Sequence, residues 1–431
     1  MRLDFWFDLS CPYAYLASQR LGQVLSGRPA DLRYRPMLLG GVFREIGAGD
    51  GPMATLSDAK RANLARDLAR WAAVAGVPLE TPAAHPMRTV RALRTLLGLP
   101  EPSWPAATHA LFAAYWQRGE DITQDEVIAA ALTGAGVPAT AVRSALAEAD
   151  SDARKRDLRA RTDEAVALGV FGAPAFLVHA PPQEGGPRLF WGQARLTWVA
   201  AMLDGWRPPA APPPAALAAP TAPTAPTAPH TIDFYFDVAS PFAYLGLTQI
   251  ERIAAGHSLR LRPILLGGLF RTIGTPDVPL LTFPEAKRRY IAGELATWAA
   301  WWSQPFAFPA RFPQRTTTAQ RILLLAAEDP PLQLALALGF ARAMWAQGEV
   351  LEDAGTLAAV LERAGAPQEL LAMAAEPAAK AALIDATAAA AAAGVFGVPT
   401  CVIDEDAAQL FWGQDRLVLV ERALAASSLR M

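Results

Sequence analysis

The chain has 431 residues, of which 52% are hydrophobic, and its formal net charge at neutral pH is −2. This length accommodates two domains that can each bury a full core. The charge is nearly balanced, and no block of basic residues with interleaved aromatic residues occurs. The sequence therefore argues against a nucleic-acid partner and favours small-molecule chemistry.

Neither a leader nor a membrane segment is expected. The chain begins with a strand-like alternation at residues 3–7, without a basic segment followed by an apolar stretch. The longest apolar runs, such as 386–393, are rich in alanine and too short to span a bilayer. We therefore expect a cytoplasmic protein that does not associate with membranes.

The two halves of the chain repeat one another. A repeat of about two hundred residues indicates duplicated domains, because solenoid repeats extend over a few tens of residues. Four segments of the first half recur in the same order in the second half: 4–16 as 233–245, 35–44 as 262–271, 169–174 as 394–399, and 190–196 as 411–417.

Residues 207–230 separate the repeats and consist mainly of proline, alanine and threonine. Such a composition has too little apolar bulk to fold and favours extended polyproline conformations. We therefore predict domains at 1–206 and 231–431, joined by a linker at 207–230. This organisation leaves open whether the copies form an intramolecular pseudo-dimer or act independently.

The elements of the first repeat follow from its hydrophobic periodicity. The predicted order is βαβ, a long helical insertion, then ββα. In chain order, we expect a strand at 3–7, a helix at 13–25, a strand at 32–37, helices at 56–75, 89–97, 106–118, 124–132 and 141–168, strands at 175–178 and 188–191, and a helix after Arg195.

A polar residue stands directly before a proline at the start of the first helix of each repeat. Cys11 precedes Pro12, and Ser240 precedes Pro241. Proline is tolerated at the first helical position, and the preceding side chain can accept a hydrogen bond from an exposed amide. We therefore place both candidate catalytic residues at helix N-termini. A plain helix cap is the alternative for Ser240.

Four ordered motifs carry a resemblance to a known family. They are Phe-Asp-x-x-Ser-Pro-Phe-Ala-Tyr-Leu, Arg-Pro-x-Leu-Leu-Gly-Gly-x-Phe, Gly-Val-Phe-Gly-Val-Pro and Phe-Trp-Gly-Gln-Asp-Arg-Leu, with close counterparts in the first repeat. The chain resembles the 2-hydroxychromene-2-carboxylate isomerases and kappa-class glutathione transferases. The resemblance implies an α/β fold, namely a DsbA-like thioredoxin fold with a large helical insertion, duplicated in tandem. It also implies glutathione as the cofactor.

The resemblance implies a role for each residue at the reactive position. Ser240 would donate a hydrogen bond to the sulfur of glutathione, and the helix N-terminus would add partial positive charge; both favour the thiolate. Cys11 departs from the family pattern, and a thiol there is expected to be acidified by the helix terminus. Ala14 stands where a second cysteine would be, which excludes a dithiol cycle. Three roles stay open for Cys11: a weak hydrogen-bond donor, a monothiol that forms a mixed disulfide with glutathione, or an inert small residue.

The resemblance also implies which residues bind glutathione. The prolines at the third strand resemble the cis-proline of thioredoxin-like sites, where the preceding backbone would pair with the cysteinyl backbone of glutathione. The predicted set is Ala173, Pro174, Gln193 and Lys60 in the first repeat, and Val398, Pro399, Gln414, Asp415 and Lys287 in the second. An ordinary turn is the alternative for the prolines, and a solvated helix face is the alternative for the lysines.

The two repeats differ at the predicted γ-glutamyl end of the site. Gln414 and Asp415 match the family segment in which a carboxylate meets the ammonium group of glutathione. In the first repeat Gln193 is kept, but Ala194 replaces the acid. The sequence therefore favours the second copy as the competent one.

Arg88 and Arg315 align at a position where the family commonly shows asparagine. Arginine can bind a carboxylate in a planar two-point contact, so both residues are candidates for the substrate carboxylate. Ordinary arginines at a helix start are the alternative. The five histidines are scattered and unmatched between the repeats, so we expect no metal site.

Three hypotheses for function follow. The first is a glutathione-dependent cis-trans isomerase acting on an aromatic chromene or arylidene-pyruvate carboxylate, in the catabolism of aromatic compounds. The second is a kappa-like glutathione transferase, or a monothiol glutathione-disulfide oxidoreductase that uses Cys11. The third is that one or both copies are non-catalytic and bind a small molecule or serve as a scaffold.

Overall fold

The computed structural model describes residues 1–49, 51, 56–209, 229–275 and 279–427. The described chain forms two compact units. Unit 1 consists of residues 1–56, 67–207 and 283–289, and unit 2 of residues 57–66, 208–282 and 290–431. Each unit therefore includes a short segment that belongs to the other repeat in sequence. The predicted domain boundaries stay predictions, and residues 210–228 of the predicted linker lie outside the described residues.

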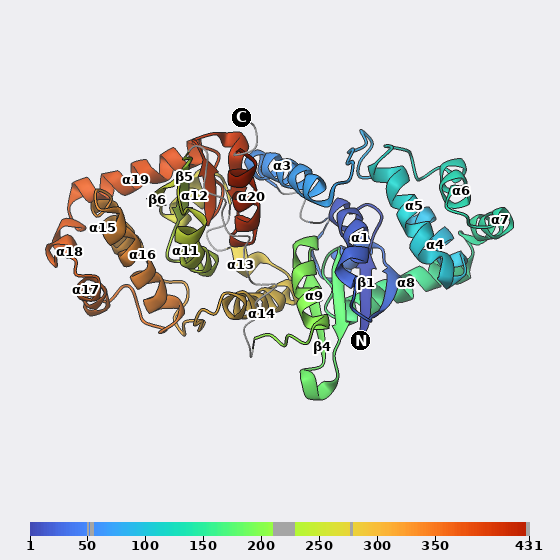
Figure 1. Ribbon diagram of the computed structural model, residues 1–431, viewed down its shortest axis with the longest axis horizontal. Helices are drawn as coiled ribbons and strands as arrows, with labels where there is room; N and C mark the ends of the chain where they lie inside the picture. Colours follow the sequence, from blue (N-terminus) through green and yellow to red (C-terminus); the bar gives the residue numbers. More distant parts are fainter. Residues whose placement is uncertain (50, 52–55, 210–228, 276–278, 428–431) are drawn as a thin grey trace. The chain divides into compact units, whose positions relative to one another are not determined.

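In the described ranges, both repeats contain the same order of strands and helices, except that the short helix α13 occurs in the second repeat alone (Figure 1). The first repeat contains β1 (Arg2–Phe7), α1 (Pro12–Leu25), β2 (Asp31–Pro36), α2 (Leu39–Glu45), α3 (Asp58–Ala75), α4 (Val90–Gly98), α5 (Trp104–Trp116), α6 (Asp125–Gly134), α7 (Ala139–Glu148), α8 (Asp152–Ala167), β3 (Ala175–His179), β4 (Pro187–Trp191) and α9 (Leu196–Leu203). The second repeat contains β5 (Thr231–Phe236), α11 (Pro241–Ile253), β6 (Ser258–Pro263), α12 (Leu266–Thr272), α13 (Pro279–Thr282), α14 (Glu285–Trp301), α15 (Thr317–Leu325), α16 (Pro330–Trp345), α17 (Ala354–Arg363), α18 (Glu369–Met373), α19 (Pro377–Ala392), β7 (Thr400–Ile403), β8 (Leu410–Trp412) and α20 (Leu417–Ser427).

Each unit is organised around a four-stranded sheet. The strand orders are β2-β1-β3-β4 in unit 1 and β6-β5-β7-β8 in unit 2. In each sheet the first two strands are parallel and the remaining pairs are antiparallel. This is the predicted βαβ, insertion, ββα order, and it confirms the expected α/β class.

The central strand of unit 1 is buried on both faces. Trp6 belongs to an apolar cluster with Met37, Val42 and Leu177. The alternate residue Phe5 stacks on Phe176, with ring centroids 5.5 Å apart. Because side chains of a strand alternate between faces, burial on both faces requires the nearly continuous apolar sequence that β1 carries.

The prediction of one long helix at 141–168 is wrong, because the structure contains two helices there. Helix α7 ends at Glu148 and α8 begins at Asp152. Between them, the Ser151 hydroxyl accepts a hydrogen bond from the Arg154 amide at 3.3 Å. Serine is a preferred N-cap because its side chain replaces the missing helical acceptor. Ser151 therefore starts a new helix within a continuous periodic pattern.

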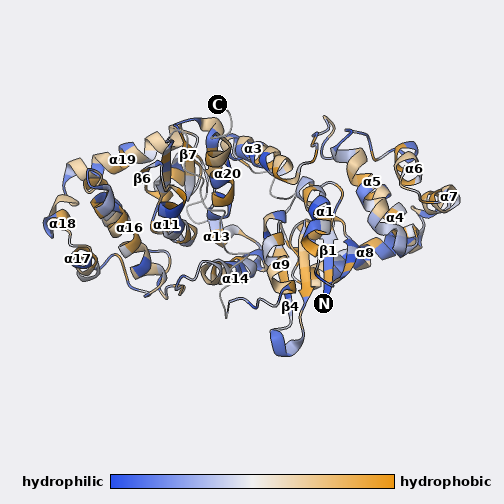
Figure 2. Ribbon diagram, viewed as in Figure 1, coloured by the Kyte–Doolittle hydropathy of each residue, from blue (hydrophilic) through white to orange (hydrophobic). Residues whose placement is uncertain are grey.

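The last helix of the insertion, α8 or α19, makes the same inward hydrogen bond in both repeats, but the hydropathy of its residues differs between them. In Figure 2, α8 is drawn mainly in hydrophilic blue and α19 in pale hydrophobic colours. On the inner face, the Thr162 hydroxyl accepts from the Leu38 amide at 3.1 Å, and the Thr387 hydroxyl accepts from the Leu265 amide at 3.0 Å. The repeats therefore retain the packing that positions α2 and α12, although their outer residues have diverged.

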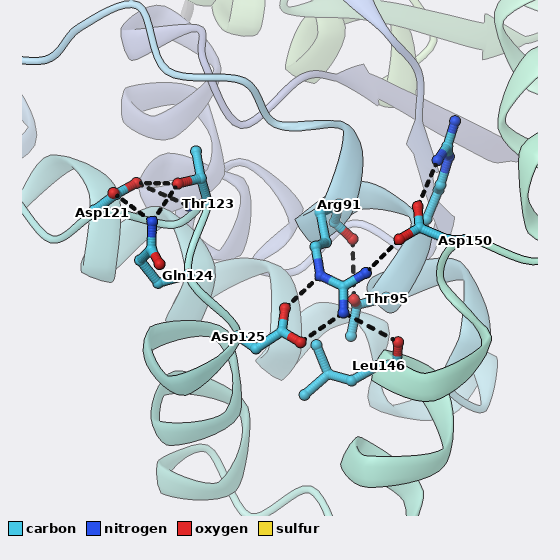
Figure 3. Close-up of polar contacts among 9 residues, drawn as sticks. Arg91, Thr95, Asp121, Thr123, Gln124, Asp125, Leu146 and Asp150 are labelled. Carbon is cyan, nitrogen blue, oxygen red and sulfur yellow. Dashed lines mark hydrogen bonds and ion pairs between the residues drawn. The ribbon is translucent and has the colours of Figure 1, made fainter.

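Helices of the unit 1 insertion are joined by a polar network around Arg91 (Figure 3). From α4, the guanidinium binds the Asp125 carboxylate at the start of α6, with Nη2 to Oδ2 at 2.5 Å. It also donates to Asp150 Oδ2 at 2.8 Å and to the Leu146 carbonyl of α7 at 3.4 Å. The aligned position in the second repeat is Thr318, so the network belongs to unit 1 alone.

No helix in the described ranges is long and apolar enough to cross a membrane.

Candidate functional site

Ser240 lies at the N-cap of α11, directly after the loop that follows β5. Its backbone is extended, with φ −97° and ψ 121°, and Pro241 occupies the first turn. The hydroxyl accepts a hydrogen bond from the Ala243 amide at 3.2 Å. Across the described ranges, its proton is donated to no protein acceptor. The hydroxyl is thus held by the helix terminus through its lone pair, which leaves its proton for a ligand.

Cys11 occupies the equivalent N-cap of α1 but makes a different contact. Its thiol donates to the Ala173 carbonyl, with Sγ and O at 3.2 Å. The side chain is 7% exposed, and burial raises the pKa of the Cys11 thiol from 9.0 to about 12. The expected acidification is wrong, because removal of the thiolate from water outweighs the nearby helix amides.

The second cysteine, Cys401, is also free and buried, on β7. Burial raises the pKa of its thiol as well. Neither cysteine forms a disulfide, and neither carries the features of a reactive thiolate.

The two prolines predicted to face the reactive residues follow cis peptide bonds, as expected: Ala173–Pro174 and Val398–Pro399. In unit 2, the Gly413 amide donates to the Pro399 carbonyl at 2.8 Å. A Cβ built on Gly246 of α11 would lie 3.2 Å from Pro399 Cγ, so this helix packs closely on the proline. The Ser240 helix, Pro399 and the turn before Gln414 therefore meet at one place.

Gln414 and Asp415 lie in a 3-10 turn, Gln414–Arg416, at the start of α20. Gln414 is buried. The Asp415 carboxylate pairs with Arg416, with Oδ2 and Nη1 at 2.6 Å. A Cβ on Gly413, whose φ is +107°, would lie only 2.7 Å from Asp415 Oδ1. The carboxylate thus lies against a backbone that only glycine can supply without strain.

The matching turn of unit 1 has a different charge arrangement. Gln193 is buried, and its Oε1 accepts a hydrogen bond from Arg20 Nη1 at 2.5 Å. The aligned residue in the second repeat is Gln249, and Ala194 stands where unit 2 has Asp415. At this turn, a guanidinium therefore binds an amide oxygen in unit 1, whereas a guanidinium binds the Asp415 carboxylate in unit 2.

The two predicted lysines lie beside the tryptophans that precede these turns. Within unit 2, the Lys60 ammonium is 5.1 Å from the centre of the Trp412 ring. Within unit 1, Lys287 is 5.5 Å from the Trp191 ring. Burial lowers the pKa of Lys60. Alignment predicted the pair of lysines, but it gave no indication that each belongs to the unit of the other repeat.

The predicted carboxylate-binding arginines are exposed at the starts of α4 and α15. The Arg315 amide donates to Glu352 Oε1 at 3.0 Å. The buried polar residues at these places are their neighbours, Thr89 and Thr316. Substrate binding by the arginines therefore stays a prediction.

Sequence reasoning missed the buried aspartates next to the reactive positions. Asp8 and Asp237 are 1% exposed, and each accepts a hydrogen bond of 2.7 Å from the threonine just named. A usable signal was present, because both repeats place an acid directly after three consecutive aromatic residues at the end of a strand. An acid in that context requires internal hydrogen-bond donors.

Comparison with known families decides the classification. A family model described as "DSBA-like thioredoxin domain" matches residues 2–204 and again 231–425. The chain belongs to the DSBA-like thioredoxin family. The two matches to this family lie in the two repeats, in agreement with the duplicated sheet and insertion.

Relatives of this DSBA-like protein have two kinds of name. Glutathione S-transferase kappa 1 of Caenorhabditis elegans is 29% identical over 217 residues, covering 48% of this chain and 92% of the relative. The 2-hydroxychromene-2-carboxylate isomerase of Sphingobium xenophagum is 29% identical over 203 residues, covering 45% and 97%. A solved 2-hydroxychromene-2-carboxylate isomerase is 25% identical, covers 47% of this chain and 95% of its own, and has a TM-score of 0.40.

Proposed function

We propose that the protein is a glutathione-dependent cis-trans isomerase of the 2-hydroxychromene-2-carboxylate isomerase type, and that unit 2 carries the catalytic site. The observation that carries this proposal is the Ser240 hydroxyl, which accepts the Ala243 amide at 3.2 Å and keeps its proton for a ligand. A hydroxyl donor at a helix N-terminus stabilises a thiolate more than a neutral thiol. Ser240 would therefore favour the reactive form of bound glutathione.

The surrounding residues suit the rest of the glutathione molecule. The Val398 backbone before Pro399 would pair with the cysteinyl backbone, and Asp415 would meet the γ-glutamyl ammonium. The Lys60 ammonium, beside Trp412 in unit 2, would bind a carboxylate. In this proposal glutathione supplies the thiolate, while the chain binds it, orients it and holds the charge on its sulfur.

The proposed reaction consumes no glutathione. The thiolate adds to the conjugated carbon of an aromatic arylidene-pyruvate, and the electron pair moves to the carbonyl oxygen. The former double bond rotates as a single bond. The electron pair then returns, the carbon–sulfur bond breaks, and thiolate leaves the product with the other double-bond geometry. No oxidant, metal or further co-reactant is needed.

Turnover of 2-hydroxychromene-2-carboxylate with and without glutathione tests the proposal. We expect no turnover without glutathione, and a loss of about 10²-fold or more in kcat/KM for Ser240→Ala, as when one donor to a developing charge is removed. Cys11→Ala is the matched control and should retain wild-type kcat/KM. Undiminished turnover without glutathione would contradict the mechanism.

A second candidate function is glutathione transfer, because relatives named glutathione S-transferase kappa are as similar as the isomerase. Conjugation of glutathione to an aryl halide distinguishes it, since that reaction consumes glutathione stoichiometrically. The monothiol route through Cys11 is less favoured, because that thiol is buried and donates to Ala173. For unit 1 we propose a non-catalytic role, as a binding or scaffold copy. A pseudo-dimer and a cytoplasmic location stay predictions.

A further inference from the structure

A buried carboxylate lies directly behind each reactive position. Asp237 is at the end of β5, three residues before Ser240, and is 1% exposed. Its Oδ1 accepts from the Ala239 amide at 2.9 Å and from the Thr316 hydroxyl at 2.7 Å. Its Oδ2 accepts from the Leu266 amide at 2.8 Å. Both oxygens are therefore occupied by donors.

Asp8 in unit 1 has the same environment. Its Oδ1 accepts from the Ser10 amide at 3.0 Å, the Ser10 hydroxyl at 3.1 Å and the Thr89 hydroxyl at 2.7 Å. Its Oδ2 accepts from the Leu39 amide at 2.7 Å. Among the described residues, the groups that act on either carboxylate are uncharged hydrogen-bond donors. A buried carboxylate held by uncharged donors thus occurs in both units.

Such a group is unfavourable for stability by itself. Burial raises the pKa of Asp237, and the hydrogen bonds from Ala239, Leu266 and Thr316 act in the opposite direction. A buried carboxylate is tolerated only where several donors replace water. The segments that these donors belong to therefore indicate the role of Asp237.

The donors of Asp237 come from three separate segments of unit 2. Ala239 belongs to the loop that presents Ser240, Leu266 begins α12, and Thr316 precedes α15. The main chain of the same loop is held as well: the Ser240 amide donates to the Asp237 carbonyl at 3.0 Å, and Trp345 Nε1 donates to the Val238 carbonyl at 2.7 Å. Every residue from Asp237 to Ser240 is thus anchored by at least one hydrogen bond.

We infer that Asp237 is a positioning residue for the Ser240 site, in which its carboxylate ties the loop to the starts of α12 and α15 and thereby sets where the Ser240 hydroxyl points. The inference rests on the proposed glutathione function of unit 2. In this inference Asp237 acts through the backbone of Ala239, whose amide its carboxylate binds, and not on the ligand itself. A displacement of about 1 Å at such a donor is enough to reduce a rate by roughly 10²-fold.

Asp237→Asn tests this inference, because the amide has the shape of the carboxylate but turns one acceptor into a donor. Facing N–H and O–H donors, it loses at least one of the three hydrogen bonds. We expect weaker glutathione binding by calorimetry, a higher pH for the appearance of thiolate absorbance of bound glutathione, and a fall of about 10- to 100-fold in kcat/KM.

Asp8→Asn is the matched control, since it makes the same change in unit 1. Both variants should lower the thermal unfolding midpoint, but only Asp237→Asn should shift the thiolate titration and kcat/KM. Equal effects of the two variants on these readouts, or an unshifted titration in Asp237→Asn, would overturn the inference while leaving the glutathione function intact. Absence of glutathione binding to the wild type would overturn the proposed function and this inference together.

A milder pair of variants covers the case in which Asp237→Asn does not fold. Thr316→Val removes one donor and keeps the side-chain shape, Thr316→Ser keeps the hydroxyl, and Thr89→Val is the unit 1 control. We expect Thr316→Val to shift the thiolate titration in the same direction by a smaller amount, and Thr316→Ser to restore it. A shift in Thr89→Val equal to that in Thr316→Val would contradict the positioning role.

Discussion

Cys11 of unit 1 and Ser240 of unit 2 occupy equivalent N-cap positions with the same extended backbone conformation. Their side chains nevertheless form hydrogen bonds in opposite directions. In unit 1 the Cys11 thiol donates to the Ala173 carbonyl at 3.2 Å. In unit 2 the Ser240 hydroxyl accepts the Ala243 amide at 3.2 Å. A donor that is already used inside the protein cannot stabilise the sulfur of a ligand. The direction of one hydrogen bond thus distinguishes the two positions, both of which are buried.

The turns predicted to bind the γ-glutamyl end of glutathione also differ between the units. Unit 2 has Asp415 in its turn, whereas unit 1 has Ala194 and the Arg20–Gln193 hydrogen bond. The Asp415 carboxylate, although paired with Arg416, would attract an ammonium group, whereas Ala194 offers no negative charge. Both differences are consistent with the proposal that unit 2 binds glutathione, and each can be tested separately.

The largest expected effect concerns the thiol of unit 1. Because burial raises the pKa of Cys11 from 9.0 to about 12, its thiolate fraction at pH 8 is roughly a thousandfold lower than that of an ordinary thiol. We expect iodoacetamide to modify native protein slowly and to modify both cysteines rapidly in denaturant. Mass spectrometry of the native and unfolded protein measures this difference. Fast native labelling of Cys11 would restore the monothiol hypothesis.

The same shift predicts the direction of a pH effect on stability. Since the folded pKa of Cys11 is above the unfolded value, its contribution is complete below pH 9 and is lost as the pH rises from about 9 to about 12. Thermal unfolding midpoints of Cys11→Ala should therefore fall less steeply than those of the wild type over that range. Parallel curves for the two proteins would contradict the buried thiol.

The next largest effect concerns the acid that unit 1 lacks. Asp415→Ala should weaken glutathione binding by roughly 10- to 100-fold, the size expected when a hydrogen bond to a charged group is lost. The converse variant, Cys11→Ser with Ala194→Asp, should raise the binding stoichiometry measured by calorimetry from one towards two. Unchanged affinity in Asp415→Ala would remove the γ-glutamyl assignment.

A smaller effect is expected for the glycines that both units share. A Cβ on Gly397 would lie 2.6 Å from Trp412 Nε1, and one on Gly172 would lie 2.7 Å from Trp191 Nε1. Either alanine substitution should destabilise the protein by about 1–3 kcal/mol, as overpacking does. Only Gly397→Ala should also weaken glutathione binding, because Trp412 borders Gln414. Gly293→Ala, with no atom within 4 Å of its Cβ, is the control for denaturant unfolding.

The smallest effect is expected at the Arg91 network, which unit 2 lacks. The Asp125 pKa is lowered by its hydrogen bond from Arg91, so this contribution is present at neutral pH and is lost as the pH falls. Arg91→Met should reduce the free energy of unfolding by about 1 kcal/mol or less, because the pairs are partly exposed. Glutathione binding should be unchanged. Urea unfolding at pH 7 and pH 3 checks both points, and a difference that grows at pH 3 would contradict this account.

Much of this fold could be predicted from the sequence. Strand alternation and helical periodicity placed the sheets and the insertion, because they record which side chains are buried. The break at Ser151 was missed, since an N-cap interrupts a helix without interrupting its apolar pattern. Proline before each third strand and the residues before Pro12 and Pro241 were placed correctly, because proline restricts the backbone in a way that sequence reveals directly.

The residue types at the candidate site could be read from the sequence, but the pKa of the Cys11 thiol could not. The acidification expected for Cys11 considered the helix terminus and omitted burial, which depends on residues far away in the chain, such as Ala173. Arg88 and Arg315 were predicted as site residues because they align between the repeats. The buried residues at these places are the adjacent threonines, which donate hydrogen bonds to Asp8 and Asp237. The membership of Lys60 in unit 2 depends on tertiary packing and has no local sequence signal.

The N-cap serine has a consequence for how the protein would withstand oxidants. A hydroxyl cannot be converted to a sulfenic, sulfinic or sulfonic acid, whereas a catalytic thiolate can. The two sulfur atoms of the cysteines are buried and held as neutral thiols. Under the proposed function, the reactive sulfur belongs to glutathione and not to the chain, so the Ser240 position would stay chemically intact under conditions that oxidise the cysteine of a cysteine enzyme.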